Sequence, residues 1–369
     1  MNSNYLINDY RKVSSFSKTS FSGYPKKDII KSFINNMILS KLHDSCYLGI
    51  EMHISLYFNL IIENVFLISS QYVNISNPNL PNILYNELLR INEIKSYNKI
   101  KDDRNDQEIR NLISYIISVV TISPKNSNFQ IDLLTKINDM NFDVFIIEKN
   151  IKYKNLDLVM KLFFPDESKE LILIINEIAN ILRNPSGKTK EILYWFSWLI
   201  DWEKKCRRDG NELIIKSRKI EGVTPKNSKF WEWIVWSVFI NEAYYRDNQN
   251  IYKQIYSLYN IYKFNFKKAS RRKYMIYLLH ALFIFKKKIN WNENPLSDKQ
   301  KSIIQANFTN NMTYKLIFNG TQQKFYLEDE PETEKKPSKT HIHIKPKKET
   351  QKEIDEKEIK KRMSYLYIS

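Results

Sequence analysis

Apolar residues recur at helical spacing along most of the chain and predict a mainly α protein. From Pro25 onward, large apolar side chains return every three or four residues, which places them on one face of a helix. Further helices are predicted from Asn82 onward and over residues 45–69, 106–122, 129–139, 168–183, 188–206, 227–246, 249–264 and 269–288. Strands do not alternate with helices in this pattern, so we expect a multi-helix globular bundle or array.

The predicted helix at 45–69 is apolar nearly all round, which is typical of a central, buried helix. Gly49 lies inside it, although a mid-helix glycine costs about 1 kcal/mol relative to alanine. We therefore expect a neighbouring backbone to approach closely at Gly49. The prolines within residues 77–81 end this helical pattern, because each proline removes a backbone donor and restricts the preceding residue.

The pattern changes at both ends of the chain. Residues 1–24 are rich in serine and asparagine, show little periodicity and are expected to form a flexible arm. Two short apolar runs flank Asn319-Gly320 and predict a small β-hairpin at 314–327. Residues 328–369 combine an acidic run, a lysine- and proline-containing run and very few apolar side chains, so we expect a disordered charged tail there.

These changes divide the sequence into four predicted segments. The flexible arm precedes an N-terminal helical domain at 25–183 and a Trp-rich, basic helical domain at 184–327 that ends in the hairpin. The tail at 328–369 is the fourth segment. It ends in an apolar peptide that is either a frayed terminus or a docking peptide for a protein partner, and this peptide comprises Tyr365, Leu366, Tyr367 and Ile368.

Length and composition restrict the class of protein. The chain has 369 residues, of which 43% are hydrophobic and 14% aromatic, so a core can form without disulfide or metal staples. The two cysteines, Cys46 and Cys206, lie far apart and outside any CxxC pair, which favours a reducing, intracellular compartment, cytoplasmic or nuclear. We expect neither a signal peptide nor a membrane span.

The formal net charge of +17 predicts attraction to polyanions such as nucleic acid or acidic membrane surfaces. Residues 251–300 contribute eleven basic and two acidic side chains to this excess. A tyrosine stripe at Tyr252, Tyr256 and Tyr259 precedes one basic cluster, and an apolar run at 274–285 separates that cluster from a second one. The candidate nucleic-acid-binding residues are Lys263, Lys267, Lys268, Arg271, Arg272, Lys273, Lys286, Lys287 and Lys288.

Such clusters would neutralise phosphates with salt-sensitive, sequence-independent affinity. The apolar run predicts a short buried helix with positive charge at both ends. Two other interpretations stay open: a solvated face whose lysines reflect AT-rich codons, and a nuclear import signal at 267–273.

No arrangement of residues is typical of an active site, and we expect no metal and no cofactor. Gly187-Lys188-Thr189 matches the last three residues of a phosphate-binding loop motif. The motif also requires a glycine at position 182, where this chain has Leu182, and a strand before the loop, where this chain has a helical pattern. Ser186 is instead expected to cap the following helix, with Glu191 in its early part.

Two groups of residues that contain histidine are candidates for chemical sites. His43, Cys46, Glu51 and His53 lie close in sequence, but their spacing does not converge on one helix face, which favours core or surface roles. His341 and His343 lie in the predicted tail and could bind metal only adventitiously.

Six tryptophans form two clusters at helical spacing. Trp195, Trp198 and Trp202 lie on one predicted helix, and Trp231, Trp233 and Trp236 lie on another. Aromatic side chains can stack on single-stranded nucleic acid. Core packing is the stronger interpretation, and the two helices could face each other.

Three strings within residues 21–90 carry a family resemblance: FSGYPKKDIIKSFINNMI, KLHDSCYLGIEMH and YVNISNPNLPNILYNELLR. They resemble a family of uncharacterised proteins encoded by large nucleocytoplasmic DNA viruses. The resemblance implies a viral replication, transcription or virion context, and with it a replication compartment or virion as the location. It implies no catalytic residues.

Three functional hypotheses follow. The first is a non-enzymatic, nucleic-acid-associated helical protein of viral replication, transcription or genome packaging. The second is a structural or scaffold protein, including a virion protein, that binds acidic proteins or membrane. The third is an enzyme whose site is assembled only in three dimensions.

Overall fold

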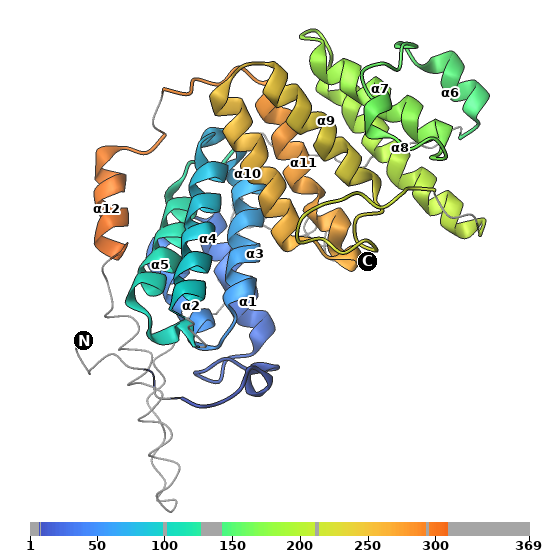
Figure 1. Ribbon diagram of the computed structural model, residues 1–369. Helices are drawn as coiled ribbons and strands as arrows, with labels where there is room; N and C mark the ends of the chain where they lie inside the picture. Colours follow the sequence, from blue (N-terminus) through green and yellow to red (C-terminus); the bar gives the residue numbers. More distant parts are fainter. Residues whose placement is uncertain are drawn as a thin grey trace, which may run out of the picture.

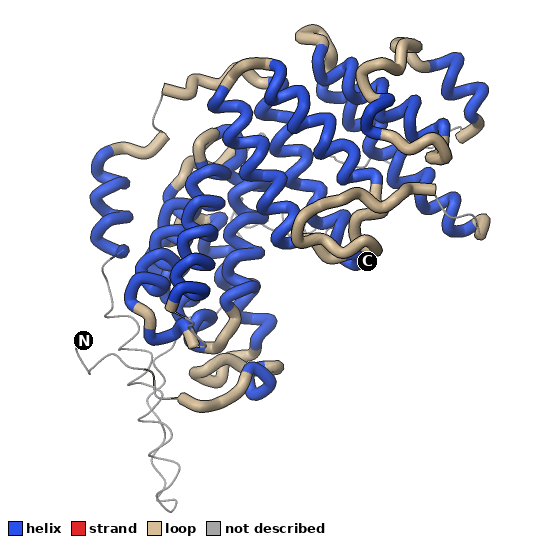
Figure 2. The backbone as a smooth tube through the Cα atoms, in the orientation of Figure 1, coloured by secondary structure: helices blue, strands red, loops and turns tan. Residues whose placement is uncertain are grey.

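Helices form the regular structure of the chain. The structure is a computed structural model that describes residues 7, 9–98, 102–126, 142–210, 214–292 and 295–308. Within these residues it contains helices and one isolated bridge between Thr19 and Pro25, but no strand (Figure 2). The prediction of a mainly α protein is therefore confirmed. The predicted helix at 129–139, the hairpin at 314–327 and the tail at 328–369 lie outside the described residues.

Five helices form the N-terminal part of the fold (Figure 1). They are α1 (Lys26–Ile38), α2 (Leu42–Ile54), α3 (Phe58–Ile68), α4 (Leu80–Tyr97) and α5 (Gln107–Ile122). Helix α5 packs against α1, α2, α3 and α4. Its apolar face supplies buried isoleucines and leucine to the core at the centre of this group.

Seven helices follow in the described residues. They are α6 (Val144–Asn150), α7 (Lys169–Arg183), α8 (Thr189–Arg208), α9 (Trp231–Tyr245), α10 (Gln249–Asn265), α11 (Arg271–Lys286) and α12 (Asp298–Phe308). Helix α7 packs on α8 and α9, while α10 packs on α4 and α11 on α3. Helix α12 returns to lie beside α5 (Figure 1). One cluster of buried apolar side chains runs through both groups of helices, and the boundary at 183/184 stays a prediction.

The prediction of one helix over 45–69 is wrong, because two helices occupy this stretch. Helix α2 ends at Ile54 and α3 begins at Phe58. Between them Leu56 adopts a left-handed conformation with φ of 60°, and the Ser55 hydroxyl donates to the Glu51 carbonyl at 2.6 Å. The break lets the chain reverse, so that both apolar segments become core helices.

The prediction that a neighbouring backbone approaches Gly49 is wrong, because side chains occupy this space. A Cβ atom at Gly49 would overlap Cδ1 of Ile117 on α5 and would lie 3.3 Å from Cε2 of Phe33 on α1. The glycine therefore lets three helices meet, which offsets its low helix propensity.

The described part of the predicted flexible arm packs on the core. Phe16 and Phe21 are buried, at 1% and 4% exposure. The backbone N–H and the hydroxyl of Ser22 both donate to the buried Glu51 carboxylate, each at 2.8 Å. Residues 9–24 are thus tied to α2, which differs from the expectation of a flexible arm for 1–24.

Helix α11 is buried along most of its length, as its apolar run predicts. Twelve of its 16 residues are buried, between α3, α7, α8 and α10. A helix of 16 residues is about 24 Å long, so the two predicted basic clusters lie at well-separated ends. The helix also carries a buried histidine, His280, whose Nδ1 lies 3.1 Å from Oγ of Ser70.

The six clustered tryptophans belong to the core. Helices α8 and α9 meet where Trp231 lies 6.0 Å from Phe196, measured between ring centroids, but the other tryptophans of the two clusters pack on different neighbours. Trp198 lies against Trp202 and Phe142, with ring centroids 5.2 Å apart in each pair. Trp233 and Trp236 instead pack against Tyr262 of α10, at 4.9 and 5.6 Å. Trp233 and Trp236 therefore form the surface on which α10 packs.

Candidate polyanion-binding surface

At the N-terminal end of α11, Arg271 is a buried structural residue. Its guanidinium bonds to the carboxylates of Glu203 on α8 and Glu232 on α9. It also lies over the Phe230 ring, 4.7 Å from the centroid. With its side chain only 6% exposed, Arg271 is not accessible to a phosphate.

Lys267 and Lys273 share one carboxylate, that of Glu63 on α3. Their Nζ atoms lie 3.2 and 2.8 Å from the two carboxylate oxygens, and the Tyr274 hydroxyl donates to the same group at 3.0 Å. Burial tends to raise the pKa of Glu63, but the two ammonium groups and the hydroxyl outweigh burial and hold it below its usual value. Glu63 therefore stays charged and compensates part of the positive charge.

The remaining cations at this end are Lys263, Lys268 and Arg272. None of them forms an ion pair within the described part of the chain. Lys268 is exposed, whereas Lys263 and Arg272 are half-buried. The Lys263 ammonium lies 5.9 Å from the centroid of the Tyr259 ring. A polyanion could reach these three side chains without competing with a carboxylate, whereas Lys267, although its side chain is 63% exposed, is already paired with Glu63.

At the C-terminal end of α11, Lys286 caps the C-terminal end of α7. Its Nζ donates to the carbonyls of Ile181 and Asn184, at 2.6 and 2.9 Å. A Cβ atom at Gly187 would overlap the same Ile181 carbonyl and lie 3.1 Å from the Asn184 carbonyl, so only glycine lets the loop close here. Burial, and next the nearby Arg246, lower the pKa of Lys286. Gly187-Lys188 is thus a helix-joining turn, not a phosphate loop.

A pocket of about 540 Å³ opens beside Lys286. Five of its lining residues are cationic and one is acidic. The lining residues are Arg183, Pro185, Glu242, Arg246, Asn248, Ile251, Phe285, Lys286, Lys287 and Lys288. They come from the ends of α7, α9 and α11 and from the start of α10, and the cations among them come from the ends of α7, α9 and α11.

Arg246 fixes the shape of this pocket. It bonds to Glu242 at 3.0 Å and donates to the carbonyls of Phe285 and Leu182, at 3.1 and 2.8 Å. Because these contacts join the ends of three helices, they hold the cationic wall rigid. The guanidinium of Arg246 is therefore structural, although it adds positive charge to the pocket.

Arg183, Lys287 and Lys288 are the accessible cations of the pocket. Arg183 bonds to Glu242 through Nε at 3.0 Å, and its side chain is 47% exposed. Lys287 and Lys288 are exposed and form no ion pair within the described residues. The sequence pattern did not single out Arg183 or Arg246. Both arginines lie in or next to the last turn of a helix, and this position is the sequence signal that could have identified them as candidate anion-binding residues.

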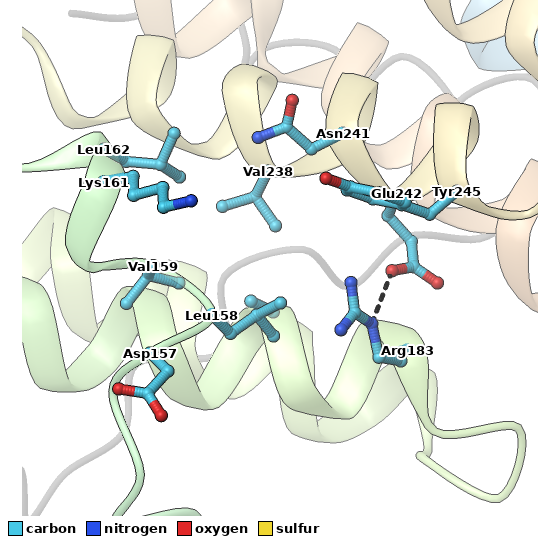
Figure 3. Close-up of a pocket in the computed structure, with 11 residues that line it drawn as sticks. Asp157, Leu158, Val159, Lys161, Leu162, Arg183, Val238, Asn241, Glu242 and Tyr245 are labelled. Carbon is cyan, nitrogen blue, oxygen red and sulfur yellow. Dashed lines mark hydrogen bonds and ion pairs between the residues drawn. The ribbon is translucent and has the colours of Figure 1, made fainter.

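Arg183 and Glu242 also line a second pocket, of about 550 Å³, and Figure 3 shows their ion pair at one end of it. Leu158, Val159 and Val238 form an apolar wall there. Its polar side chains are Asp157, Lys161, Arg183, Asn241, Glu242 and Tyr245. This lining includes no histidine or cysteine, and two of its charged groups, Arg183 and Glu242, form an ion pair with each other.

The histidine and cysteine group near α2 does not converge. The His43 side chain is 91% exposed, whereas His53 is buried with Nε2 3.3 Å from Asp103. Cys46 faces Ser118, with Sγ and Oγ 3.4 Å apart, and burial raises the pKa of its thiol. Cys46 and His53 thus pack α2 on its neighbours, whereas His43 lies on the surface, so the group is not brought together.

Among the residues that the structure describes, no three His, Cys, Asp or Glu side chains lie close enough together to hold a metal ion. None of the described helices combines the length and the apolar character that crossing a bilayer requires. A scan against protein-family models finds no match, and searches of curated proteins and of solved structures find none either.

Proposed function

We propose that this protein binds nucleic acid through its phosphate backbone, without sequence specificity, at the pocket beside Lys286. The gathering of five cations around one carboxylate in a single pocket carries the proposal. Two of the cations, Lys286 and Arg246, are held by backbone carbonyls and keep the pocket in shape. Phosphate binding would neutralise the excess charge and release counterions.

Arg183, Lys287 and Lys288 would make the direct contacts. Arg183 presents the part of its guanidinium that does not face Glu242, and the two lysines present ammonium groups on an exposed turn. Charge-assisted bonds of this kind are shorter and stronger than neutral ones. They position a backbone without reading bases.

The cations at the other end of α11 would provide a second contact. Lys263, Lys268 and Arg272 lie about 24 Å from the pocket along the helix axis. An extended polyanion can reach both ends at once, whereas a small anion can occupy only one. The proposal includes the biological context that the resemblance over residues 21–90 implies. In that context the protein would act in viral replication, transcription or genome packaging.

The test is fluorescence anisotropy with labelled DNA, duplex and single-stranded, at about 50 and about 200 mM salt. The variant Arg183→Gln/Lys287→Gln/Lys288→Gln should weaken binding about 10-fold or more, and should reduce the salt slope by about 3 because three phosphate contacts are lost. The matched control is Lys27→Gln/Lys31→Gln/Lys41→Gln. It removes the same charge from exposed positions on and next to α1.

An equal loss in both triple variants would show that only the net charge matters, and the pocket would then have no specific role. Wild-type affinity that does not respond to salt would also overturn the proposal. If anionic vesicles or an acidic polypeptide bind more tightly than DNA, the scaffold hypothesis becomes the better one. Substituting Lys263, Lys268 and Arg272 by glutamine would measure the second contact separately.

A further inference from the structure

A row of five tyrosines runs over the surface from the end of α9 along α10. It comprises Tyr245, Tyr244, Tyr252, Tyr256 and Tyr259. Successive ring centroids lie 5.7, 6.4, 5.9 and 6.4 Å apart, so each ring touches the next. The rings of Tyr252 and Tyr256 are nearly parallel, with an interplanar angle of 13°.

These rings are accessible to a ligand although aromatic side chains normally avoid water. Tyr244 and Tyr245 are each 71% exposed and Tyr256 is 43% exposed, while Tyr252 and Tyr259 are half-buried. Single exposed apolar residues are common on protein surfaces, but a contiguous row is typical of a binding site.

The row is supported from below by the second tryptophan cluster. Tyr259 lies 6.2 Å from Trp233 and 5.9 Å from Trp236, measured between ring centroids. Both tryptophans are buried on α9, with at most 1% exposure. The row therefore has a rigid base at its Tyr259 end, and little freedom of that side chain would be lost on binding.

Cations lie at both ends of the row. The Arg183 guanidinium lies 5.9 Å from the Tyr245 ring, and the Lys263 ammonium lies 5.9 Å from the Tyr259 ring. Arg183 belongs to the pocket at the C-terminal end of α11, and Lys263 to the basic group at its N-terminal end. Helix α10, which packs along α11, thus joins the two candidate phosphate-binding sites with a track of aromatic rings.

We infer that the nucleic acid bound by this surface is single-stranded and that its bases stack on the row of tyrosines. This inference rests on the proposed function, because the cations at both ends supply the phosphate contacts. A single strand offers unpaired bases that can stack on aromatic side chains whatever their sequence, and a positively charged groove follows its backbone. A duplex keeps its bases stacked inside, so it would use the cations alone.

The test compares two double variants on matched single-stranded and duplex DNA of about 20 nucleotides, a length that exceeds the span of typical single-strand sites. Tyr244→Ser/Tyr256→Ser removes two exposed rings, and Tyr244→Phe/Tyr256→Phe keeps them. We expect the serine variant to lose about 5-fold or more in affinity for the single strand. The phenylalanine variant should bind like the wild type, and duplex binding should change in neither. Circular dichroism checks that both variants are folded.

A second measurement reports stacking directly. A single strand that contains 2-aminopurine should lose fluorescence on binding to the wild type and to the phenylalanine variant, but not to the serine variant. If the serine variant binds the single strand as tightly as the wild type, or if no quenching occurs, the row is not a stacking surface. A protein partner would then be the better occupant.

The two proposals fail in different ways. If the tyrosine variants have no effect while the Arg183, Lys287 and Lys288 variant loses salt-sensitive binding, only the stacking inference is wrong. If the wild type binds neither form of DNA at about 50 mM salt, both proposals are wrong.

Discussion

Arg271 and Glu232 form an ion pair inside the protein, with Nη1 and Oε1 2.5 Å apart and side chains 6% and 1% exposed. Burial raises the pKa of Glu232, and Arg271 opposes that shift. The second oxygen of Glu232 is buried without a hydrogen-bond partner among the described residues. The charge of Arg271 is therefore the main compensation for this buried carboxylate.

We expect Arg271→Gln to destabilise the protein by about 3–5 kcal/mol, because it leaves the buried carboxylate of Glu232 without its cation, while Glu203 keeps only its ion pair with Arg207. Urea unfolding at neutral pH measures the change. The matched control is Arg272→Gln, at a half-buried position without an ion pair in the described residues, which should cost at most about 1 kcal/mol. The double variant Arg271→Gln/Glu232→Gln should recover part of the loss. Equal stability of the two arginine variants would contradict this account.

Protonation of His280 should couple folding to pH. Burial lowers the pKa of His280 to about 3, whereas an imidazole in the unfolded chain has a pKa of about 6.5. The unfolded chain therefore takes up the proton first as pH falls. The contribution of His280 to stability is complete above about pH 6.5 and decreases toward pH 3. At pH 5 the loss is about 2 kcal/mol.

The variant His280→Asn removes this titration and can still bond to Ser70. We expect it to be less stable than the wild type at pH 8 and to lose about 2 kcal/mol less between pH 8 and pH 5. Urea midpoints at the two pH values give the comparison. His43→Asn is the control, because it makes the same substitution at a side chain that is 91% exposed and outside the core. Identical pH dependence in all three proteins would show that His280 is protonated equally in both states.

The end of α1 offers a stabilising substitution. Ser40 follows the helix with φ of 57°, its N–H donates to Met37, and the N–H of Lys41 donates to Asn36 at 2.9 Å. This is the left-handed helix end at which glycine is preferred. Glycine adopts this conformation without steric strain, but it also gives the unfolded chain more conformational entropy. With both effects included, Ser40→Gly should stabilise the protein by about 0.5–1 kcal/mol. Ser40→Ala is the control and should give no gain in a urea melt.

Local patterns predicted the helices well, because apolar periodicity is a property of neighbouring residues. The predicted helix at 168–183 corresponds to α7 at Lys169–Arg183. The break at Leu56 was missed because neither Gly, Asn nor Pro marks the left-handed residue. The predicted cap at Ser186 was also wrong, since α8 begins at Thr189, where the Glu191 carboxylate accepts from the N–H of Lys188 at 3.0 Å.

The electrostatics of the candidate surface could not be predicted in the same way. Glu63 neutralises Lys267 and Lys273 from positions 204 and 210 residues away in the chain, a separation that no local pattern reveals. The tyrosine row, in contrast, was predicted in part, because the stripe along α10 follows from helical spacing in the sequence. Its extension to Tyr244 and Tyr245 was not, because those side chains come from α9 and join the row only in the folded protein.

The packing of α10 on α4 also affects how the protein is made. The N–H of Asn82 donates to the side-chain carbonyl of Gln254 at 3.0 Å, across 172 residues of chain. A ribosome therefore has to synthesise most of the molecule before α4 meets this partner. Until then the apolar surface of α4 that α10 will cover stays exposed, and chaperones can bind the nascent chain there.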